Sequence, residues 1–212
     1  MSDTENSCPL KTRPQVLARR LARFFVKRNV APNQMSLAGV AFAFLGALAF
    51  MASSIGNETI QAIALIAAAV LIQLRLLANM LDGLMAVEEG KKTSTGSLYK
   101  ELPNRIADVL FLFAAGFATG WPSLGWLASL LAVLTAYVRA LGGSLGVEQN
   151  FCGPMAKTHR MFALTAGSLL AAFMPRWPIL ALTLCVIIVG SVVTIARRTQ
   201  HLARALNRSL HD

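Results

Sequence analysis

The residues of this chain best suited to chemistry lie on either side of a short polar segment. Before it, Arg75, Asn79 and Asp82 follow one another at intervals of three or four residues, with Ala86 one turn further on. Residues at that spacing share one face of an α-helix. Ionisable groups of this kind are costly in an apolar setting, so they usually pair, bind an ion or line an aqueous cavity. The pattern therefore indicates either a site or a set of ion pairs.

A second polar stripe follows the segment. Lys100, Asn104 and Asp108 recur every four residues, and Glu101 lies beside Lys100 on the same broad face. If the two helices form a hairpin, the two stripes face each other. Carboxylates on facing helices, with Lys and Arg around them, suit a divalent cation that bridges a diphosphate.

The surrounding residues allow a catalytic and a structural interpretation. Gly83 and Gly96 lack side chains near the seam between the stripes, which would let the phosphates of a ligand approach the backbone closely. Alternatively, Arg105 pairs with Asp108 or Glu101 and holds the helices in register. Spacing alone favours neither interpretation.

The elements that position these residues are predicted to be membrane helices. Of the 212 residues, 55% are hydrophobic and only 14% are charged, which is too apolar for an ordinary soluble domain. The formal net charge is +10, but the bases lie between apolar runs and form no aromatic-interleaved face, so we expect no nucleic-acid partner. The three cysteines are far apart, which favours neither a disulfide framework nor a zinc site.

Six apolar runs predict an all-α protein with six transmembrane helices, since about 20 apolar residues cross a bilayer core. The predicted helices are residues 35–54, 59–78, 98–119, 124–143, 155–174 and 178–196. Ser36 can cap the first of them after the break at Pro32. The third reaches its length only by taking Lys100, Glu101 and Asn104 into its first turns.

One membrane domain, 1–212, is expected, with a flexible leader at 1–10 and a basic tail at 197–212. Bases and apolar residues alternate over 11–28, which predicts either an amphipathic helix in the membrane interface or a plain basic anchor. Basic loops alternate with loops whose only base is Arg176. Because cytoplasmic loops collect Lys and Arg, both termini are predicted to be cytoplasmic.

The polar residues also carry a family resemblance. The pattern Asn79-x-x-Asp82-Gly83-x-x-Ala86-Val87, then Gly96, Lys100 and Asn104, resembles the signature of the CDP-alcohol phosphatidyltransferases. That signature reads D-x-x-D-G-x-x-A-R, a spacer, then G-x-x-x-D-x-x-x-D. The resemblance covers nearly the whole chain, because the family also has an amphipathic lead-in, Pro-Asn before the first span, and six transmembrane helices.

The resemblance implies a membrane phosphotransferase of phospholipid biosynthesis, in a bacterial inner membrane. Members transfer a group from CDP-diacylglycerol or another CDP-alcohol to a hydroxyl acceptor and release CMP. Their four aspartates hold Mg²⁺ or Mn²⁺, the last is the proposed general base, and members commonly form homodimers. Position by position, the aspartates fall on Asn79, Asp82, Lys100 and Asn104, so Asn104 takes the catalytic position. Gly83, Ala86 and Gly96 match the signature, whereas Val87 replaces its arginine.

Basic residues after the fourth span bind substrate phosphate in the family, which implies this role for Arg139, Lys157 and Arg160. The run 153–157, Gly-Pro-Met-Ala-Lys, resembles the family's phosphate loop.

Because only Asp82 retains a carboxylate among the four positions, three outcomes remain open. Glu101 and Asp108 complete a shifted catalytic and metal site with Asp82, or Lys100 neutralises the diphosphate in place of one metal. In the third outcome, the protein binds a nucleotide or lipid, or supports a partner enzyme, without turnover. A transporter fits less well, because the polar residues gather at one end of the predicted bundle and form no path across it.

Overall fold

A computed structural model describes residues 13–88, 96–147 and 153–208, with side chains over 18–85, 101–147 and 153–207. The predicted leader, 1–10, lies outside this part of the chain. The described residues form seven helices and no strand, so the predicted all-α class is confirmed. The helices are α1 (Arg13–Lys27), α2 (Pro32–Ala52), α3 (Glu58–Glu88), α4 (Gly96–Ala118), α5 (Pro122–Ser144), α6 (Lys157–Phe173) and α7 (Ile179–Arg208).

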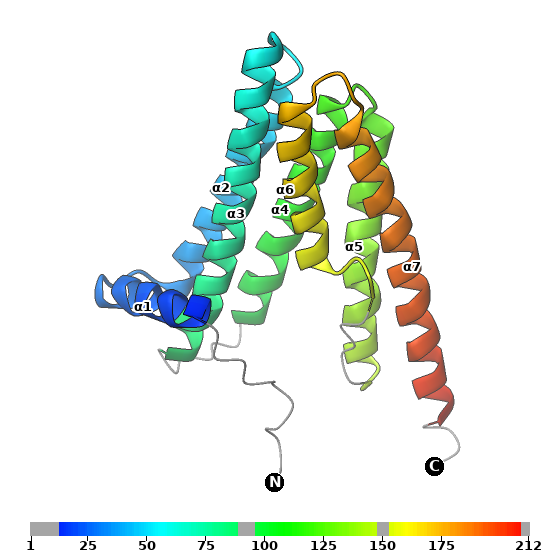
Figure 1. The fold of residues 1–212 in the computed structure, drawn as a ribbon. Coiled ribbons are helices and arrows are strands. Elements are labelled where there is room, and N and C mark those ends of the chain that lie inside the picture. The colour runs from blue at the N-terminus through cyan, green and yellow to red at the C-terminus, as the bar shows by residue number, and fades with distance from the viewer. Residues whose placement is uncertain (1–12, 89–95, 148–152, 209–212) are drawn as a thin grey trace.

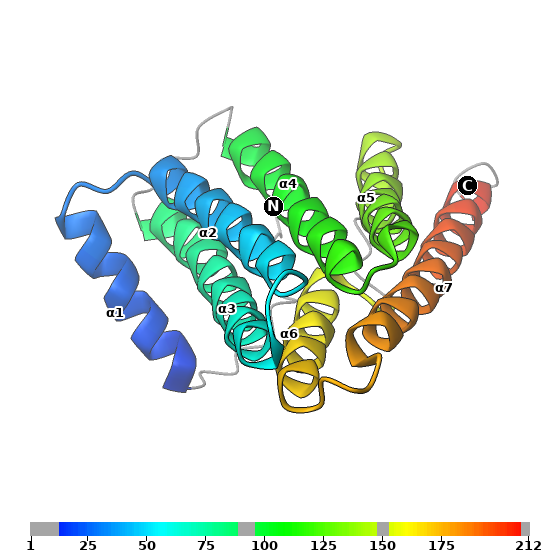
Figure 2. The same cartoon turned by 90° about the horizontal axis from the view of Figure 1, so that it is seen from above.

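The six helices α2 to α7 form a ring in which each packs against two neighbours (Figures 1 and 2). The order around the ring is α2, α3, α6, α7, α5, α4 and back to α2. Successive helices run in opposite directions, so α2, α4 and α6 begin at the end of the bundle where α3, α5 and α7 finish (Figure 1). The finish of α7 lies on that side, which we call the terminal end of the bundle (Figure 1).

The predicted set of six spans is only partly matched. Four helices of the described chain are long and apolar enough to cross a membrane, namely α2, α3, α5 and α7. The other two ring helices, α4 and α6, carry charged residues: Lys100, Glu101, Arg105 and Asp108 in α4, and Lys157 and Arg160 in the 17-residue α6. Length and composition therefore support a membrane bundle with four candidate spans.

Two helices are longer than their apolar runs. The apolar run of the second span ends at residue 78, but α3 continues to Glu88. Asn79 and Asp82 therefore lie on this helix, as their spacing predicts. Likewise, α7 continues to Arg208, so most of the predicted tail is helical and only 209–212 lie outside the described residues.

The predicted cap at Ser36 is also wrong. The first turn of α2 instead starts at Pro32, whose missing N–H suits the first helical position. The side chain of Gln34 accepts a hydrogen bond from the Ala31 amide at 3.0 Å and so satisfies a backbone donor there. The Ser36 hydroxyl therefore does not cap α2, and it makes its hydrogen bond to Asp82 of α3 instead.

Small residues allow close packing within the ring, as in many membrane bundles. Gly116 of α4 and Gly125 of α5 lie so close that a Cβ on either would collide with the backbone of the other helix. Alanines such as Ala43 and Ala68 surround the buried Phe50 and Phe111 in the main core.

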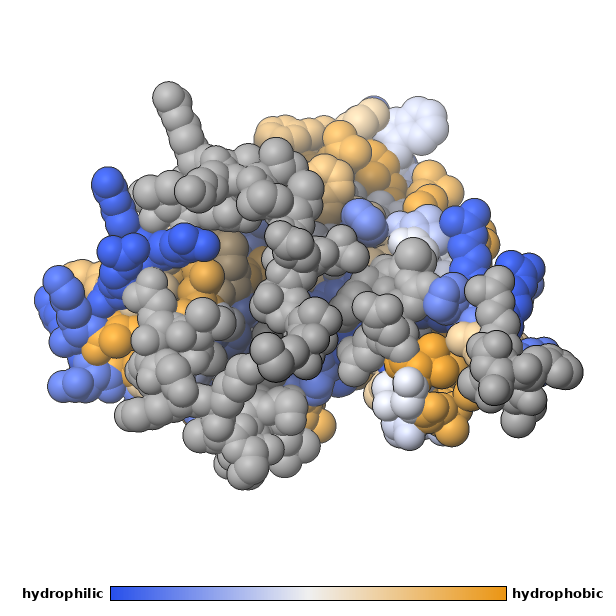
Figure 3. Space-filling model, turned by 90° about the horizontal axis from the view of Figure 1, so that it is seen from below, coloured by the Kyte–Doolittle hydropathy of each residue, from blue (hydrophilic) through white to orange (hydrophobic). Residues whose placement is uncertain are grey.

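The short helix α1 packs against α3 and lies crosswise to the bundle at the terminal end (Figure 1). Its Ala22 packs against Met35 of α2 and Met85 of α3, whereas Arg20 and Arg23 are exposed. Seen from the terminal end, hydrophilic surface gathers on the α1 side and on the α7 side of the molecule (Figure 3). The helix predicted within 11–28 is therefore confirmed over Arg13–Lys27, and its described side chains form one packed and one basic face.

Candidate functional site

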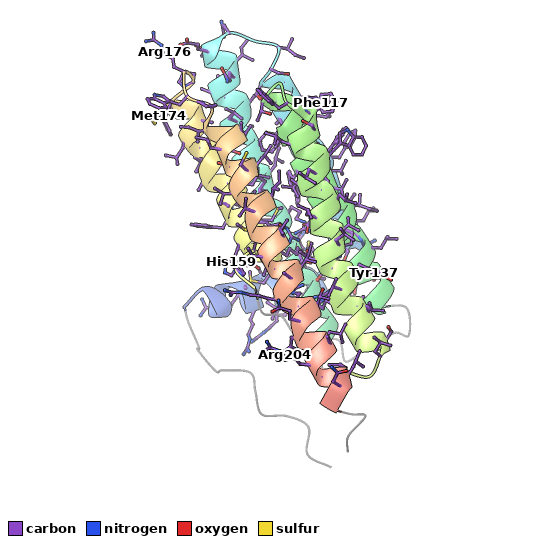
Figure 4. All side chains as sticks on the ribbon, turned by 90° about the vertical axis from the view of Figure 1, so that its right-hand side faces the viewer. Phe117, Tyr137, His159, Met174, Arg176 and Arg204 are labelled. Carbon is purple, nitrogen blue, oxygen red and sulfur yellow. The ribbon has the colours of Figure 1, made fainter. Side chains whose placement is uncertain are left out.

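Polar side chains from all six bundle helices meet toward the terminal end. Figure 4 shows the contrast along the bundle: Arg204 and His159 lie toward this end, and Phe117, Met174 and Arg176 lie at the other. The starts of α2, α4 and α6 and the finishes of α3, α5 and α7 therefore supply the site.

Arg75 of α3 connects the two predicted stripes. Only 1% of this residue is exposed. Its Nη2 atom donates to the backbone oxygen of Asn104 at 3.0 Å, to Asn104 Oδ1 at 2.9 Å and to Asp108 Oδ1 at 3.3 Å. The two stripes thus face each other, as predicted. The predicted hairpin of α3 and α4 is not a directly packed pair, however, because α2 lies between these two helices in the ring.

Asp108 is the centre of a buried ion triad. Its Oδ2 accepts a hydrogen bond at 3.2 Å from Nη2 of Arg160, which is also 1% exposed, while its Oδ1 accepts from Arg75. Arg160 Nη1 donates in addition to Thr135 Oγ1 and to the Met155 backbone oxygen, each at 3.0 Å. The triad joins α3, α4 and α6, and a buried charge of this kind depends on its partners.

Asn104, at the position of the family's general base, is held by two cations. Its Oδ1 accepts from Lys157 Nζ at 2.6 Å as well as from Arg75. An amide oxygen accepts both bonds without carrying charge. The structure thus brings a predicted catalytic residue and a predicted phosphate-binding residue into direct contact.

Asp82 lies in a pocket between α2, α3 and α4. Its Oδ2 accepts from Ser36 Oγ at 2.6 Å. The pocket has ≈ 220 Å³ of empty space, including its opening to solvent. Its lining residues are Ser36, Gly39, Val40, Arg75, Asn79, Asp82, Pro103 and Asn104. The predicted residues Asn79, Asp82 and Asn104 therefore share one pocket.

Glu101 lies apart from that pocket, in a half-exposed ion-pair cluster. It accepts from Arg105 at 2.6 Å and from the predicted phosphate ligand Arg139 of α5 at 2.7 Å. Arg105 also approaches Asp108 at 4.0 Å. Both ion pairs predicted for Arg105 are therefore confirmed, and Glu101 is engaged in salt bridges.

The run resembling a phosphate loop is braced against α7. Gly153 has a φ of +137°, a backbone conformation that residues other than glycine rarely adopt, and a Cβ there would collide with Thr194. The Met155 amide donates to Thr194 Oγ1 at 3.0 Å. This bracing sets the start of α6 and so positions Lys157 and Arg160.

Some predicted residues have no described side chain. Lys100 and Gly96 lie in the first turns of α4, and Ala86 lies in the last turn of α3, but their placement is described only as backbone. Gly83 lies within α3, one residue after Asp82. The hypothesis that Lys100 neutralises the diphosphate in place of one metal therefore stays a prediction.

Two site residues were missed by sequence reasoning. Ser36 is 46 residues from Asp82, and Thr135 is 25 residues from Arg160. A single Ser or Thr in an apolar run gives no local signal of its distant partner. Only the arrangement of the ring, which places α2 beside α3, makes the contact with Ser36 visible.

Comparison with known proteins then identifies the family. The chain is 30% identical over 194 residues to the phosphatidylinositol phosphate synthase of Mycolicibacterium smegmatis, covering 86% of this chain and 82% of that protein. The chain belongs to the CDP-alcohol phosphatidyltransferase family. It is also 26% identical over 164 residues to the Escherichia coli inner membrane protein YnbA, covering 77% and 79% of the two chains. With the four apolar helices, these relatives support an integral membrane protein.

A solved crystal structure has the same fold as this protein. It is the crystal structure of Mycobacterium tuberculosis phosphatidylinositol phosphate synthase, PgsA1, with CDP-DAG bound. Its TM-score is 0.74 at 21% identity, covering 88% of this chain and 94% of that one. PgsA1 in complex with manganese and citrate matches with the same TM-score over 87% and 88%. No family model matches the chain.

A divalent cation does not fit the described donors, although the family resemblance implies one. Hard cations take six or more oxygen ligands, usually with several carboxylates. At the family's four positions, Asn79 and Asn104 are amides, and Asn104 is already bound by Lys157 and Arg75. Within the described ranges, no three His, Cys, Asp or Glu side chains are grouped so as to hold a metal.

Proposed function

We propose that the protein is a membrane phosphotransferase of phospholipid biosynthesis that uses a CDP-activated lipid such as CDP-diacylglycerol. The observation that carries this proposal is the similarity over most of the chain to a phosphatidylinositol phosphate synthase. The meeting of Asp82, Asn104 and Lys157 toward one end of the ring supports it further. The acceptor is an alcohol that attacks through its hydroxyl group.

In the proposed reaction, the acceptor oxygen bonds to the lipid-linked phosphorus of the donor. The bond from that phosphorus to the bridging oxygen breaks, and CMP leaves with the electron pair. Asp82 is our candidate to receive the hydroxyl proton, because its carboxylate lines the pocket and is oriented by Ser36. Fixed cations stabilise the charge that develops on the phosphates.

The other predicted residues receive supporting roles. Asp108 accepts from two guanidinium groups, so we assign it the positioning of Arg75 and Arg160 rather than proton transfer. Glu101 fixes Arg139 at the rim of the site through their 2.7 Å salt bridge. Gly83, Ala86 and Gly96 remain proposed points of close backbone approach to the ligand, with Lys100 beside its phosphates.

The proposed membrane arrangement is a single domain of six spans with α1 in the interface. α4 and α6 complete the ring with the four candidate spans, and their charged first turns lie at the terminal end, where water and headgroups can reach them. The bases of α1 would contact anionic lipid. We propose an inner-membrane location with both termini cytoplasmic and, from the family resemblance, a homodimer.

A second candidate function is binding of the same lipid or nucleotide without turnover. It is favoured by Asn104, which cannot act as a base and is held by Lys157 and Arg75. A protein of this kind would retain the ligand or support a partner enzyme.

An assay of CMP release from CDP-diacylglycerol separates the two functions. Purified protein is tested against a panel of acceptors that includes inositol phosphate, glycerol phosphate and serine. The proposal expects acceptor-dependent CMP release that disappears in Asp82→Ala. Release only by the double variant Lys100→Asp, Asn104→Asp would favour binding without turnover.

A further inference from the structure

We infer that this site binds the diphosphate of its ligand without a divalent cation, with Arg75, Lys157 and Arg160 supplying the positive charge. The inference rests on the proposed function, because it concerns the same CDP-linked ligand. It goes beyond that function by replacing the metal implied by the family resemblance with side chains of this chain.

The balance of charge in the site is the first argument. Arg75, Lys157 and Arg160 face two carboxylates, Asp82 and Asp108, so the described centre has an excess of positive charge. The neighbouring cluster adds Arg105 and Arg139 against Glu101. In a partly desolvated site these cationic side chains repel a divalent metal ion and attract a diphosphate.

The state of the Asp108 carboxylate is the second argument. Both oxygens of Asp108 accept bonds from arginines, at 3.3 Å from Arg75 and 3.2 Å from Arg160. A metal that bound Asp108 would have to displace a guanidinium and leave it buried without its counter-charge. Breaking such a buried pair is strongly unfavourable.

Unsatisfied donors are the third argument. The Nη1 atom of Arg75 and the Nε atom of Arg160 are buried and have no hydrogen-bond acceptor among the described residues. Arg75 is 99% buried and lines the pocket that holds Asp82. Buried donors of this kind call for an acceptor, and phosphate oxygens are suited to arginine.

Two buried acceptor oxygens of the pocket also accept no hydrogen bond from the described residues, namely Asn79 Oδ1 and Asp82 Oδ1. Neither requires a metal. A ligand hydroxyl can donate to the Asp82 oxygen, as the proposed reaction expects of the acceptor. An asparagine amide can be turned over, which exchanges its oxygen for its NH₂ group. Asn79 can therefore donate to a phosphate or accept from a ligand hydroxyl, and either contact satisfies it.

The test measures binding of CDP-diacylglycerol to the purified full chain in detergent micelles, with CDP as the competitor. Affinity is compared in excess EDTA and in Mn²⁺. The inference expects saturable binding, competed by CDP, with dissociation constants within about twofold in the two buffers. Electron paramagnetic resonance of Mn²⁺ should then show no ion bound to the complex.

A pair of variants checks which cation acts. Lys157→Gln removes a charge-assisted contact and should weaken binding in EDTA by about ten- to a hundredfold. The matched control, Arg176→Gln, alters an exposed base at the opposite end of the bundle and should bind like the unaltered protein (Figure 4).

The failures are distinguishable. Binding that appears only with Mn²⁺ would overturn the metal-free inference and leave the proposed function standing. Absence of saturable binding in both buffers would overturn the proposed function and the inference with it. Unchanged affinity of Lys157→Gln in EDTA would overturn the assignment of the charge to this lysine and, with it, the inference as stated.

Discussion

Replacing Asp108 by Asn tests the buried ion triad that joins α3, α4 and α6. The variant keeps the shape of the side chain but removes the negative charge between Arg75 and Arg160. Both arginines are 1% exposed, so neither can reach water for compensation without a rearrangement of the bundle. Removing one partner of a buried ion pair costs about 3–5 kcal/mol.

The surrounding contacts refine this value. Arg75 keeps its bonds to Asn104, and Arg160 keeps those to Thr135 and Met155, so hydrogen bonding is largely retained. The loss is therefore electrostatic and should fall near the lower end, at about 3 kcal/mol of unfolding free energy.

Equilibrium unfolding in mixed micelles with increasing dodecyl sulfate, followed by far-ultraviolet circular dichroism, measures this loss. Glu101→Gln is the matched control, since it removes a carboxylate from a salt-bridge cluster whose Glu101 side chain is 49% exposed. That change should cost about 0.2–1 kcal/mol. An Asp108→Asn loss below about 1 kcal/mol, equal to that of the control, would refute the triad as a stabilising feature.

Four further substitutions, one of them a control, test the packing and the pocket. Gly125→Ala should destabilise the bundle by about 1–3 kcal/mol in the same unfolding assay, because its Cβ meets backbone, whereas Gly142→Ala, with only ordinary contact, should be neutral or slightly stabilising. Equal effects of these two glycine variants would contradict the close contact of α4 and α5. Gly153→Ala should lower the affinity for CDP-diacylglycerol, because strain at φ +137° shifts the start of α6, and unchanged binding would argue against this positioning role. Ser36→Ala should cost about 1–3 kcal/mol through the lost hydrogen bond to the buried Asp82, and a cost near zero would count against that bond.

The sequence predicted the helices and the facing stripes well, because both depend on local periodicity. Apolar runs predicted the six long helices, and spacing of three or four residues predicted that Arg75 would face Asn104 and Asp108. Arg105 pairs with both acids named for it, because i, i+3 and i, i+4 contacts follow from helix geometry.

The sequence did not predict which long-range partners the charges would choose. Nothing near Lys157 indicates that its ammonium reaches Asn104, and nothing in α5 indicates that Thr135 receives Arg160. These contacts depend on the order of helices around the ring. The helical continuation of α7 was also missed, because hydropathy marks where apolar residues stop, whereas α7 continues into polar sequence.

The proposed activity is tested most directly by acceptor-dependent release of CMP from CDP-diacylglycerol by the purified protein. The account predicts release by the unaltered chain, persistence of that release in excess EDTA, and its loss in Asp82→Ala. No release by the unaltered chain with any acceptor, together with release by the Lys100→Asp, Asn104→Asp double variant, would contradict the proposed activity.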